Sequence, residues 1–315
     1  MIAPDSGPMI EVPRVLGADK VRFFVENGYL VLDNFLKEKE IQEILADIPK
    51  LIRGEYTTEG NFPVLRGDES DAELLAKVLC IHQPHFVSPT MEKYLRHPLI
   101  CGVLSQITAA HLPHWDGSVK CMQSMLFVKP PGYQGQAWHQ DEIYIPTRDR
   151  SLIGAWIALD DATKENGCLW IIPGSHRDGF LFPQKGHGNA DEFDFSPQSY
   201  GFDESKEIPV EVKRGSLVFF NGYLLHRSRK NRSQAHRRVL VNHYMNAWSL
   251  LPWHHPKEGE SMAMTDYRSV IQVAGRDPYY HKGTLPPERK LWFRACKAAE
   301  TAVDHAGGVK NSHRP

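Results

Sequence analysis

The sequence predicts a mainly β protein in which helices pack against an antiparallel sandwich or barrel. Amphipathic helical segments dominate up to about residue 115, and short apolar segments separated by Pro- and Gly-containing turns follow from about residue 118. The 315 residues are 41% hydrophobic and 24% charged, which is typical of a globular protein. Without a repeat or a linker-like stretch, we expect a single domain over 1–315, with a helical part at about 18–115, a core at about 118–248 and a C-terminal extension at 249–315.

The N-terminal part begins with patterns that are typical of helices. Residues 18–27 place Val21, Phe24 and Val25 on one face, and Gly28 supplies a stop signal directly afterwards. The further elements expected here are a buried strand over 29–32, a helix with Ile41, Ile44, Leu45 and Ile48 at amphipathic spacing, a loop over 54–71, and helical segments over 74–80 and 90–106.

The second part is expected to consist of strands. In the segment 118–129, the alternation predicts that Cys121, Gln123, Met125 and Phe127 share one face of a strand. Further strands are expected over 152–159, 168–172, 208–212, 216–220 and 239–245. The polar stretch 176–207 is typical of a lid or a binding loop, whereas residues 286–303 are helix-like.

Charge and cysteine content exclude several classes of function. Lys plus Arg is 37 and Asp plus Glu is 38, so the net charge of −1 predicts neither nucleic acid nor a membrane as the main partner. A basic run at 227–232 is read as a solvated turn. Five scattered cysteines favour a reducing compartment. Residues 1–15 lack a secretory pattern and no apolar stretch could cross a bilayer, so we expect a cytoplasmic protein with a small-molecule substrate.

One of three His-x-Asp pairs is the best candidate for a metal site. The pairs are His114/Asp116, His139/Asp141 and His176/Asp178. Residues i and i+2 of an extended chain point the same way, so the two side chains of such a pair can share an ion. Because the first and third pairs lie in turn-like segments, the pair after the strand at 118–129 is preferred. Two imidazoles and one carboxylate suit mononuclear iron(II) with open positions for oxygen.

The third ligand and a cation are expected from a later part of the chain. His226 follows the apolar segment 216–225, although an isolated histidine there could equally be a strand-end hydrogen-bonding residue. Arg237, at the start of the strand over 239–245, could bind a carboxylate bidentately, although it could also be a surface residue. Arg238 would point to the opposite face of that strand.

The motifs HQDEIYIP, ENGCLWIIPGSH and HRSRKNRSQAHRR occur in this order within residues 139–238. Together they resemble the phytanoyl-CoA dioxygenase family of iron(II)- and 2-oxoglutarate-dependent oxygenases, over roughly residues 20–248. The resemblance implies a double-stranded β-helix, or jelly roll, with helices outside it. It also implies Fe(II) as cofactor and 2-oxoglutarate and O2 as co-substrates.

The resemblance also implies roles for single residues. His139, Asp141 and His226 would be the catalytic iron ligands, and Arg237 would pair with the distal carboxylate of 2-oxoglutarate. The other residues expected at the co-substrate are Ser228, Trp156, Met125, Gln140 and Lys77. Because related halogenases replace the metal carboxylate with a small residue, Asp141 favours hydroxylation.

The alternatives are a jelly-roll metalloenzyme that uses another metal without 2-oxoglutarate, and a non-catalytic binding protein of the same fold. Members of the family act on fatty acyl-CoA, amino-acid-like solutes and secondary metabolites, so the substrate stays open. Substrate contacts are expected from the loops at 57–70 and 176–207, with the candidates Tyr56, Arg66, Phe180, Phe182 and Tyr200.

Overall fold

The computed structural model describes residues 7–147, 149–249, 258 and 268–296. Its centre is an antiparallel sheet of eight strands in the order β1, β9, β4, β11, β3, β2 and β13, with β12 also paired to β3. The bounds are β1 Tyr29–Leu32, β2 Val78–His82, β3 Val119–Phe127, β4 Ile153–Ala158, β9 Leu217–Asn221, β11 Val239–Asn246, β12 Ile271–Ala274 and β13 Trp292–Ala295.

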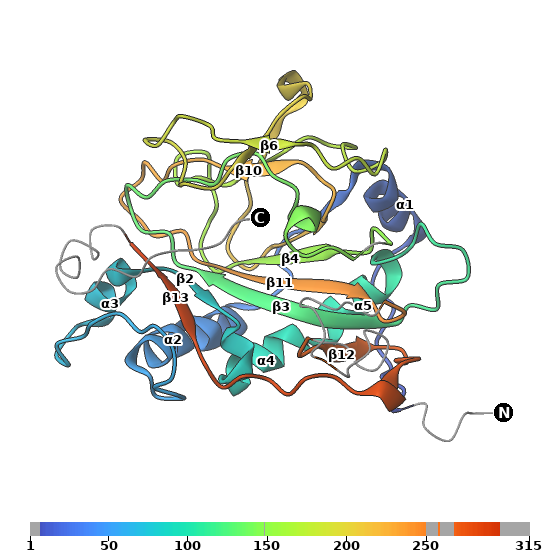
Figure 1. The fold of residues 1–315 in the computed structure, drawn as a ribbon, viewed down its shortest axis with the longest axis horizontal. Coiled ribbons are helices and arrows are strands. Elements are labelled where there is room, and N and C mark those ends of the chain that lie inside the picture. Colours follow the sequence, from blue (N-terminus) through green and yellow to red (C-terminus); the bar gives the residue numbers. More distant parts are fainter. Residues whose placement is uncertain (1–6, 148, 250–257, 259–267, 297–315) are drawn as a thin grey trace.

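A smaller sheet lies across from the large one. It has three strands in the order β10, β5 and β8, and β6 pairs with β7 in a separate ribbon. The bounds are β5 Leu169–Ile171, β6 Gln184–Lys185, β7 Gln198–Ser199, β8 Ile208–Val210 and β10 His226–Ser228. Figure 1 shows β10 and β6 on one side of the large sheet and α2 to α5 on the other. Two opposed antiparallel sheets with external helices form the jelly roll that the resemblance implies.

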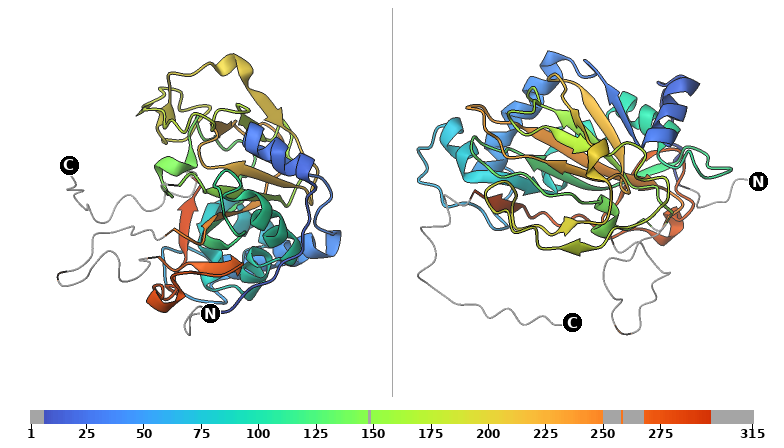
Figure 2. Two further views of the ribbon diagram at one scale, coloured as in Figure 1. Left: turned by 90° about the vertical axis from the view of Figure 1, so that its right-hand side faces the viewer. Right: turned by 90° about the horizontal axis from the view of Figure 1, so that it is seen from above.

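Helices α2 to α5 cover the face of the large sheet that is turned away from β10, whereas α1 packs beside β1 and α5. Their bounds are α1 Ala18–Asn27, α2 Glu38–Arg53, α3 Asp71–Lys77, α4 Pro89–Leu95 and α5 Pro98–Ile107, with short 3-10 turns at Pro84–Phe86, Asp141–Ile143, Glu204–Lys206 and Tyr280–Lys282. In the left view of Figure 2 the yellow segment around β6 again lies at the opposite end from the teal helices. Among the described residues, no helix is long and apolar enough to cross a membrane.

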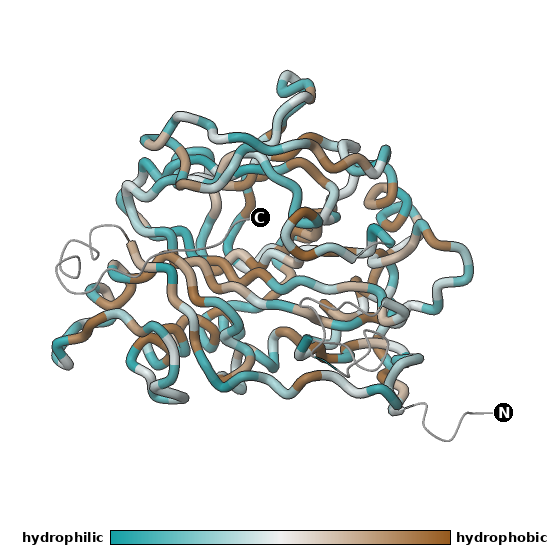
Figure 3. Tube along the Cα trace, in the orientation of Figure 1, coloured by the Kyte–Doolittle hydropathy of each residue, from teal (hydrophilic) through white to brown (hydrophobic). Residues whose placement is uncertain are grey.

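Alternation along each strand gives the large sheet two different faces. On β4, Ile153, Ala155 and Ile157 join the core beneath the helices, whereas Trp156 and Ala158 belong to the cluster on the other face. The same alternation separates Leu217 and Phe219 from Val218 and Phe220 on β9, and Leu240 and Tyr244 from Val239 and Val241 on β11. In Figure 3 hydrophobic residues follow the central strands and helices, and the loops far from the helices are mostly hydrophilic.

The first elements form as the sequence predicts. α1 spans the expected residues and ends at Gly28, whose φ of 77° places it in the left-handed region that glycine tolerates best. On α2 the expected stripe of Ile41, Ile44 and Ile48 is buried. The apolar face of the helix is therefore what fixes it to the sheet.

Three predicted helical segments need correction. The segment 74–80 is helical only to Lys77, because β2 begins at Val78 and pairs with β3. The segment 90–106 is two helices, since Pro98 starts a new one. In the C-terminal segment 286–303, Trp292–Ala295 is a strand paired with β2, and 297–303 lies outside the described residues.

The expected face of β3 is also wrong at one position. The pairing of β11 with β3 shifts between His243 and Tyr244, which pair with Gln123 and Cys121 respectively. The extra residue is a β-bulge, and it turns Cys121 into the core beneath the helices. Gln123, Met125 and Phe127 line the cavity on the other face, as the alternation predicts.

Candidate active site

A cavity of about 500 Å³ lies between the two sheets. The large sheet contributes side chains from β2, β3, β4, β9 and β11, and the smaller sheet contributes β5 and β10. The predicted residues that line it are Met125, His139, Asp141, Trp156, His226, Ser228 and Arg237. The fold therefore brings together residues that are far apart in the sequence.

Backbone pairing places the two candidate histidine ligands side by side. His139 N donates to the carbonyl of His226 at 3.0 Å, and His226 N donates to the carbonyl of His139 at 3.1 Å. This isolated bridge joins the segment after β3 to β10, which itself pairs with β5. The imidazole centroids lie 4.1 Å apart.

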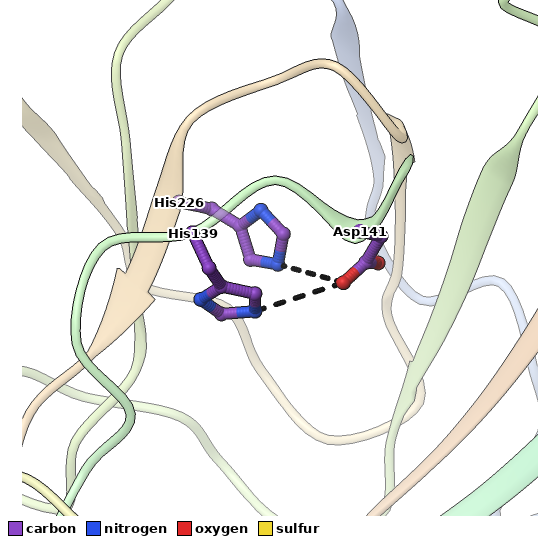
Figure 4. Close-up of side chains that lie close together, drawn as sticks. All are labelled: His139, Asp141 and His226. Carbon is purple, nitrogen blue, oxygen red and sulfur yellow. Dashed lines mark ion pairs between the residues drawn. The ribbon is translucent and has the colours of Figure 1, made fainter. Parts of the chain in front are cut away.

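Both imidazoles direct the same nitrogen to Asp141. His139 Nδ1 donates to the carbonyl of Ala137 at 2.8 Å, and His226 Nδ1 donates to the carbonyl of Leu224 at 2.9 Å. Because a carbonyl oxygen only accepts, each Nδ1 carries the proton and each Nε2 keeps a free lone pair. Each Nε2 lies 3.6 Å from Asp141 Oδ1. Figure 4 shows both imidazoles turned toward this carboxylate oxygen.

These three residues have the donor set and spacing of a metal site. Their ligand atoms lie within 4.8 Å of one another, and no other such cluster of His, Cys, Asp or Glu occurs in the described part of the chain. Two neutral imidazoles and one carboxylate on one side of an ion are the ligands of mononuclear iron(II) oxygenases. Burial, and then His226, lower the pKa of His139 to about 4, so its Nε2 remains unprotonated at neutral pH.

His243 on β11 holds the other oxygen of the carboxylate. Its Nε2 donates to Asp141 Oδ2 at 3.1 Å, and the ring is buried. Burial acts to raise the pKa of Asp141, but His226 and the hydrogen bond from His243 outweigh it and lower the pKa. The carboxylate is therefore ionised, with one oxygen anchored and the other facing the imidazoles.

Arg237 lies in the same cavity, behind Trp156. It is only 4% exposed, its guanidinium lies 5.6 Å from the centroid of the Trp156 ring, and its Nε has no hydrogen-bond partner among the described residues. Burial lowers its pKa to about 10, which still leaves it charged at neutral pH. A buried cation without a carboxylate partner indicates a site for an anionic ligand.

The neighbouring Arg238 differs, as the alternation predicts. Its Nη2 lies 2.6 Å from Asp160 Oδ1 and its Nε lies 2.8 Å from Asp160 Oδ2. It does not line the cavity. Only one of the two adjacent arginines is therefore available to a ligand there.

Two residues predicted at the co-substrate do not face the cavity. The amide of Gln140 donates to the carbonyls of Phe180 and Tyr223, because its side chain points away from those of its two neighbours. Lys77 pairs with Glu69 at 2.9 Å at the end of α3. Gln140 therefore positions the loop that follows β5, and Lys77 stabilises the turn before α3.

The loop residues that line the cavity are not the ones predicted to contact the substrate. The stretch 176–207 does contribute, but through 194–197 and not through the expected Phe180, Phe182 or Tyr200. The loop at 57–70 contributes no residue: Tyr56 hydrogen-bonds Asp47 and Arg66 pairs with Asp68 and Glu73. The other side of the mouth is Arg294 on β13, whose Nη2 lies 2.9 Å from Asp194 Oδ2.

Sequence reasoning missed Lys129, His243 and Arg294. The first two could have been found, because Lys129 continues the alternation of Met125 and Phe127, and His243 continues that of Arg237. No signal in the sequence pointed to Arg294, since its segment was expected to be a helix.

Comparisons with known proteins agree with this geometry. The family model for phytanoyl-CoA dioxygenase (PhyH) matches residues 24–239. Phytanoyl-CoA dioxygenase 1 of Oryza sativa subsp. japonica is 31% identical over 271 residues, covering 75% of this chain and 92% of the relative. Phytanoyl-CoA dioxygenase domain-containing protein 1 of Danio rerio is 29% identical, covering 76% of this chain and 94% of the relative.

A solved structure supports the fold. The epimerase SnoN, in complex with Fe3+, alpha ketoglutarate and nogalamycin RO, superposes with a TM-score of 0.58 at 18% identity, covering 82% of this chain and 94% of that chain. Family match, fold and metal-ligand cluster lead to one conclusion: the chain belongs to the phytanoyl-CoA dioxygenase family of iron(II)- and 2-oxoglutarate-dependent oxygenases.

Proposed function

We propose that the protein hydroxylates an unactivated C–H bond of a small organic or acyl substrate. One oxygen atom of O2 enters the new C–OH group and the other enters succinate, which forms from 2-oxoglutarate with release of CO2. The observation that carries the proposal is the His139, Asp141 and His226 cluster in one cavity with Arg237, whose Nε has no hydrogen-bond partner in the described part of the chain. It combines the ligands of the metal with a receptor for the co-substrate.

In this proposal the protein positions and shields the reactants. His139 and His226 present fixed lone pairs, and Asp141 presents one oxygen while His243 holds the other. Arg237 and Ser228 bind the far carboxylate of 2-oxoglutarate, and Met125 and Trp156 wall its pocket. Iron(II) bound there supplies the redox and oxygen chemistry that side chains lack.

Asp141 supports hydroxylation over halogenation. Its carboxylate occupies the position that halogenating relatives leave open for chloride, and His243 holds it there. An open ligand position for a halide would require a small residue at 141. Hydroxyl transfer to the substrate is therefore the outcome that this site favours.

The apolar part of the cavity lining supports a partly apolar substrate. Leu79, Phe127, Ile145 and Pro197 belong to this lining, and the relative from Oryza sativa is named phytanoyl-CoA dioxygenase 1. An apolar wall gives non-directional binding, so it suits a hydrocarbon portion of the substrate better than a charged one.

The first test is an anaerobic titration of the metal-free protein with iron(II) and 2-oxoglutarate. We expect the weak visible absorption band of iron-chelated 2-oxoglutarate in the wild type and its loss in His139→Ala. With that band established, candidate substrates are screened by succinate release. A folded, iron-loaded wild type without the band would contradict the proposal and favour the metalloenzyme that uses no 2-oxoglutarate.

Arg237 provides a second test against the alternatives. Arg237→Ala should weaken 2-oxoglutarate binding by about a hundredfold or more, because a bidentate charge-assisted contact is lost. The matched control is Arg238→Ala, which removes the adjacent cation on the opposite face. Equal affinities in both variants would show that the far carboxylate binds elsewhere, and a folded wild type that binds neither metal nor 2-oxoglutarate would favour the non-catalytic binding protein.

A further inference from the structure

Lys129, two residues beyond β3, is a buried cation for which the described residues provide no carboxylate ion pair. It is 2% exposed and lines the cavity. Its Nζ donates to the backbone carbonyl of Arg229 and to Ser228 Oγ at 3.4 Å, and no ion pair to Lys129 occurs within the described residues. The charges of Glu192 and Asp194 favour the ammonium form, but neither carboxylate forms an ion pair with Lys129. Because a buried ammonium group is costly unless an anion compensates it directly, this environment is incomplete.

A second buried cation lies directly across from it. Val239, the first residue of β11, pairs with Phe127, the last residue of β3, and just beyond this pair Arg237 N donates to the carbonyl of Lys129 at 3.1 Å. Both side chains line the cavity, and Arg237 has no carboxylate partner there either. Two like charges that are close together repel each other, and more strongly when they are buried. An anion between the two would remove this repulsion.

The surroundings are shaped to let the ammonium group approach. Gly167 has a φ of +80°, and a Cβ atom at this position would lie 2.7 Å from Lys129 Nζ and 2.2 Å from the carbonyl oxygen of Arg229. No other residue type fits without displacing Lys129. Ser228, whose hydroxyl also accepts from Gln136 N at 3.2 Å, holds its side chain beside Nζ. Lys129 is therefore held at the wall of the cavity by several contacts.

We propose that Lys129 is a second cation for the far carboxylate of 2-oxoglutarate, which it binds together with Arg237 and Ser228. The inference rests on the proposed function, because it assigns the anion to the co-substrate of that site. Burial, and then Arg237, lower the pKa of Lys129 well below its usual value. An arriving carboxylate therefore also favours the protonated form of the ammonium group.

A purely structural role for Lys129 makes the opposite prediction for stability. If Lys129 only fixed the turn at 228–229 through the Arg229 carbonyl, its removal would destabilise the protein without any ligand. If Lys129 instead serves to bind an anion, deleting its charge removes the repulsion from Arg237 and should not destabilise the ligand-free protein. The variant Lys129→Met keeps the aliphatic stem and deletes the charge, so it separates the two roles.

The test uses the Mn(II)-loaded full chain, with thermal melting and calorimetric titration as readouts. Without 2-oxoglutarate, Lys129→Met should melt at or above the wild-type temperature. Its affinity for 2-oxoglutarate should be weaker by about ten- to a hundredfold, and the stabilisation by this ligand should shrink accordingly. The affinity for 2-oxopentanoate, which lacks the far carboxylate, should be the same in both proteins. Arg238→Met is the control variant and should bind 2-oxoglutarate as the wild type does.

Two results would overturn the inference. One is wild-type affinity of Lys129→Met for 2-oxoglutarate. The other is a lower melting temperature without ligand together with equally weakened binding of both acids, which would assign Lys129 to the structure of the turn. If the wild type itself fails to bind 2-oxoglutarate, both the proposed function and this inference are contradicted. If the wild type binds 2-oxoglutarate and Lys129→Met binds it equally well, the inference about Lys129 is contradicted but the proposed function is not.

Discussion

The two faces of the large sheet differ although the same strands build both. The face beneath the helices carries fully buried hydrocarbon side chains such as Ile153, Phe219 and Leu240. The face toward β10 carries Lys129, Arg237 and His243 among apolar neighbours. Alternation along a strand thus lets one face provide the free energy of unfolding while the other tolerates costly buried charge. The buried charges of the cavity are therefore tolerated because the core beneath the helices stabilises the fold.

The largest effect should come from a substitution beneath the helices. Phe219→Ala removes a fully buried ring and should lower the free energy of unfolding by about 3–5 kcal/mol. Denaturant unfolding measures this change. At low temperature, where the variant remains folded, its affinity for 2-oxoglutarate should stay close to that of the wild type. A parallel tenfold loss of that affinity would mean that the two faces are not independent.

A substitution on the cavity face should change metal binding and leave stability nearly intact. His243→Leu deletes the donor to Asp141 Oδ2, so we expect metal affinity to fall by about ten- to a hundredfold. His243→Gln keeps a donor and should recover part of the loss. Calorimetric titration with Mn(II) measures both variants. Equal affinity in the wild type and in His243→Leu would show that Asp141 is oriented without this hydrogen bond.

The smallest effect concerns a histidine beneath the sheet. His85 hydrogen-bonds Ser124 Oγ at 2.5 Å, and burial lowers its pKa to about 3. In the unfolded chain a histidine has a pKa of about 6.5, so as pH falls the unfolded state binds the proton first. The resulting stability is complete above about pH 6.5 and is lost as pH falls toward 3, at up to about 1.4 kcal/mol per pH unit.

Replacing this histidine should remove that pH dependence. Between about pH 6.5 and 5, above the range in which most carboxylates titrate, the free energy of unfolding of His85→Gln should vary less than that of the wild type. Denaturant unfolding at several pH values measures the difference. Parallel curves for the two proteins would show that His85 is protonated in the folded state as readily as in the unfolded one.

The sequence predicted most of what depends on alternation and little of what depends on irregular pairing. The strand faces of β4, β9 and β11 follow from period two, and so does the contrast between Arg237 and Arg238. Cys121 was misplaced because one extra residue in β3 reverses the alternation, and a bulge leaves no composition signal. The jelly-roll arrangement of the two sheets itself came from the resemblance and not from periodicity.

The candidate site also has a part that the sequence predicted and a part that it did not. The three metal-ligand candidates lie within two short motifs, and the local sequence indicated them. The mouth is formed by β13 and the stretch 194–197, which meet only through tertiary structure. The segment containing β13 has helical propensity in isolation, and its pairing with β2 overrides that propensity. Contacts of this kind follow from the folded sheet and not from any window of sequence.

The ion pair of Asp194 with Arg294 joins a residue inside the matched segment 24–239 to one beyond it. An engineer who grafted only that segment onto another scaffold would transfer the metal ligands and Arg237, but would leave behind Arg294 and most of β11, including His243, which holds Asp141 Oδ2. Conversely, a substitution at Arg294 alone would change the lining of the cavity without touching any of the three metal-ligand candidates. The family segment therefore does not by itself carry all the residues that build this cavity.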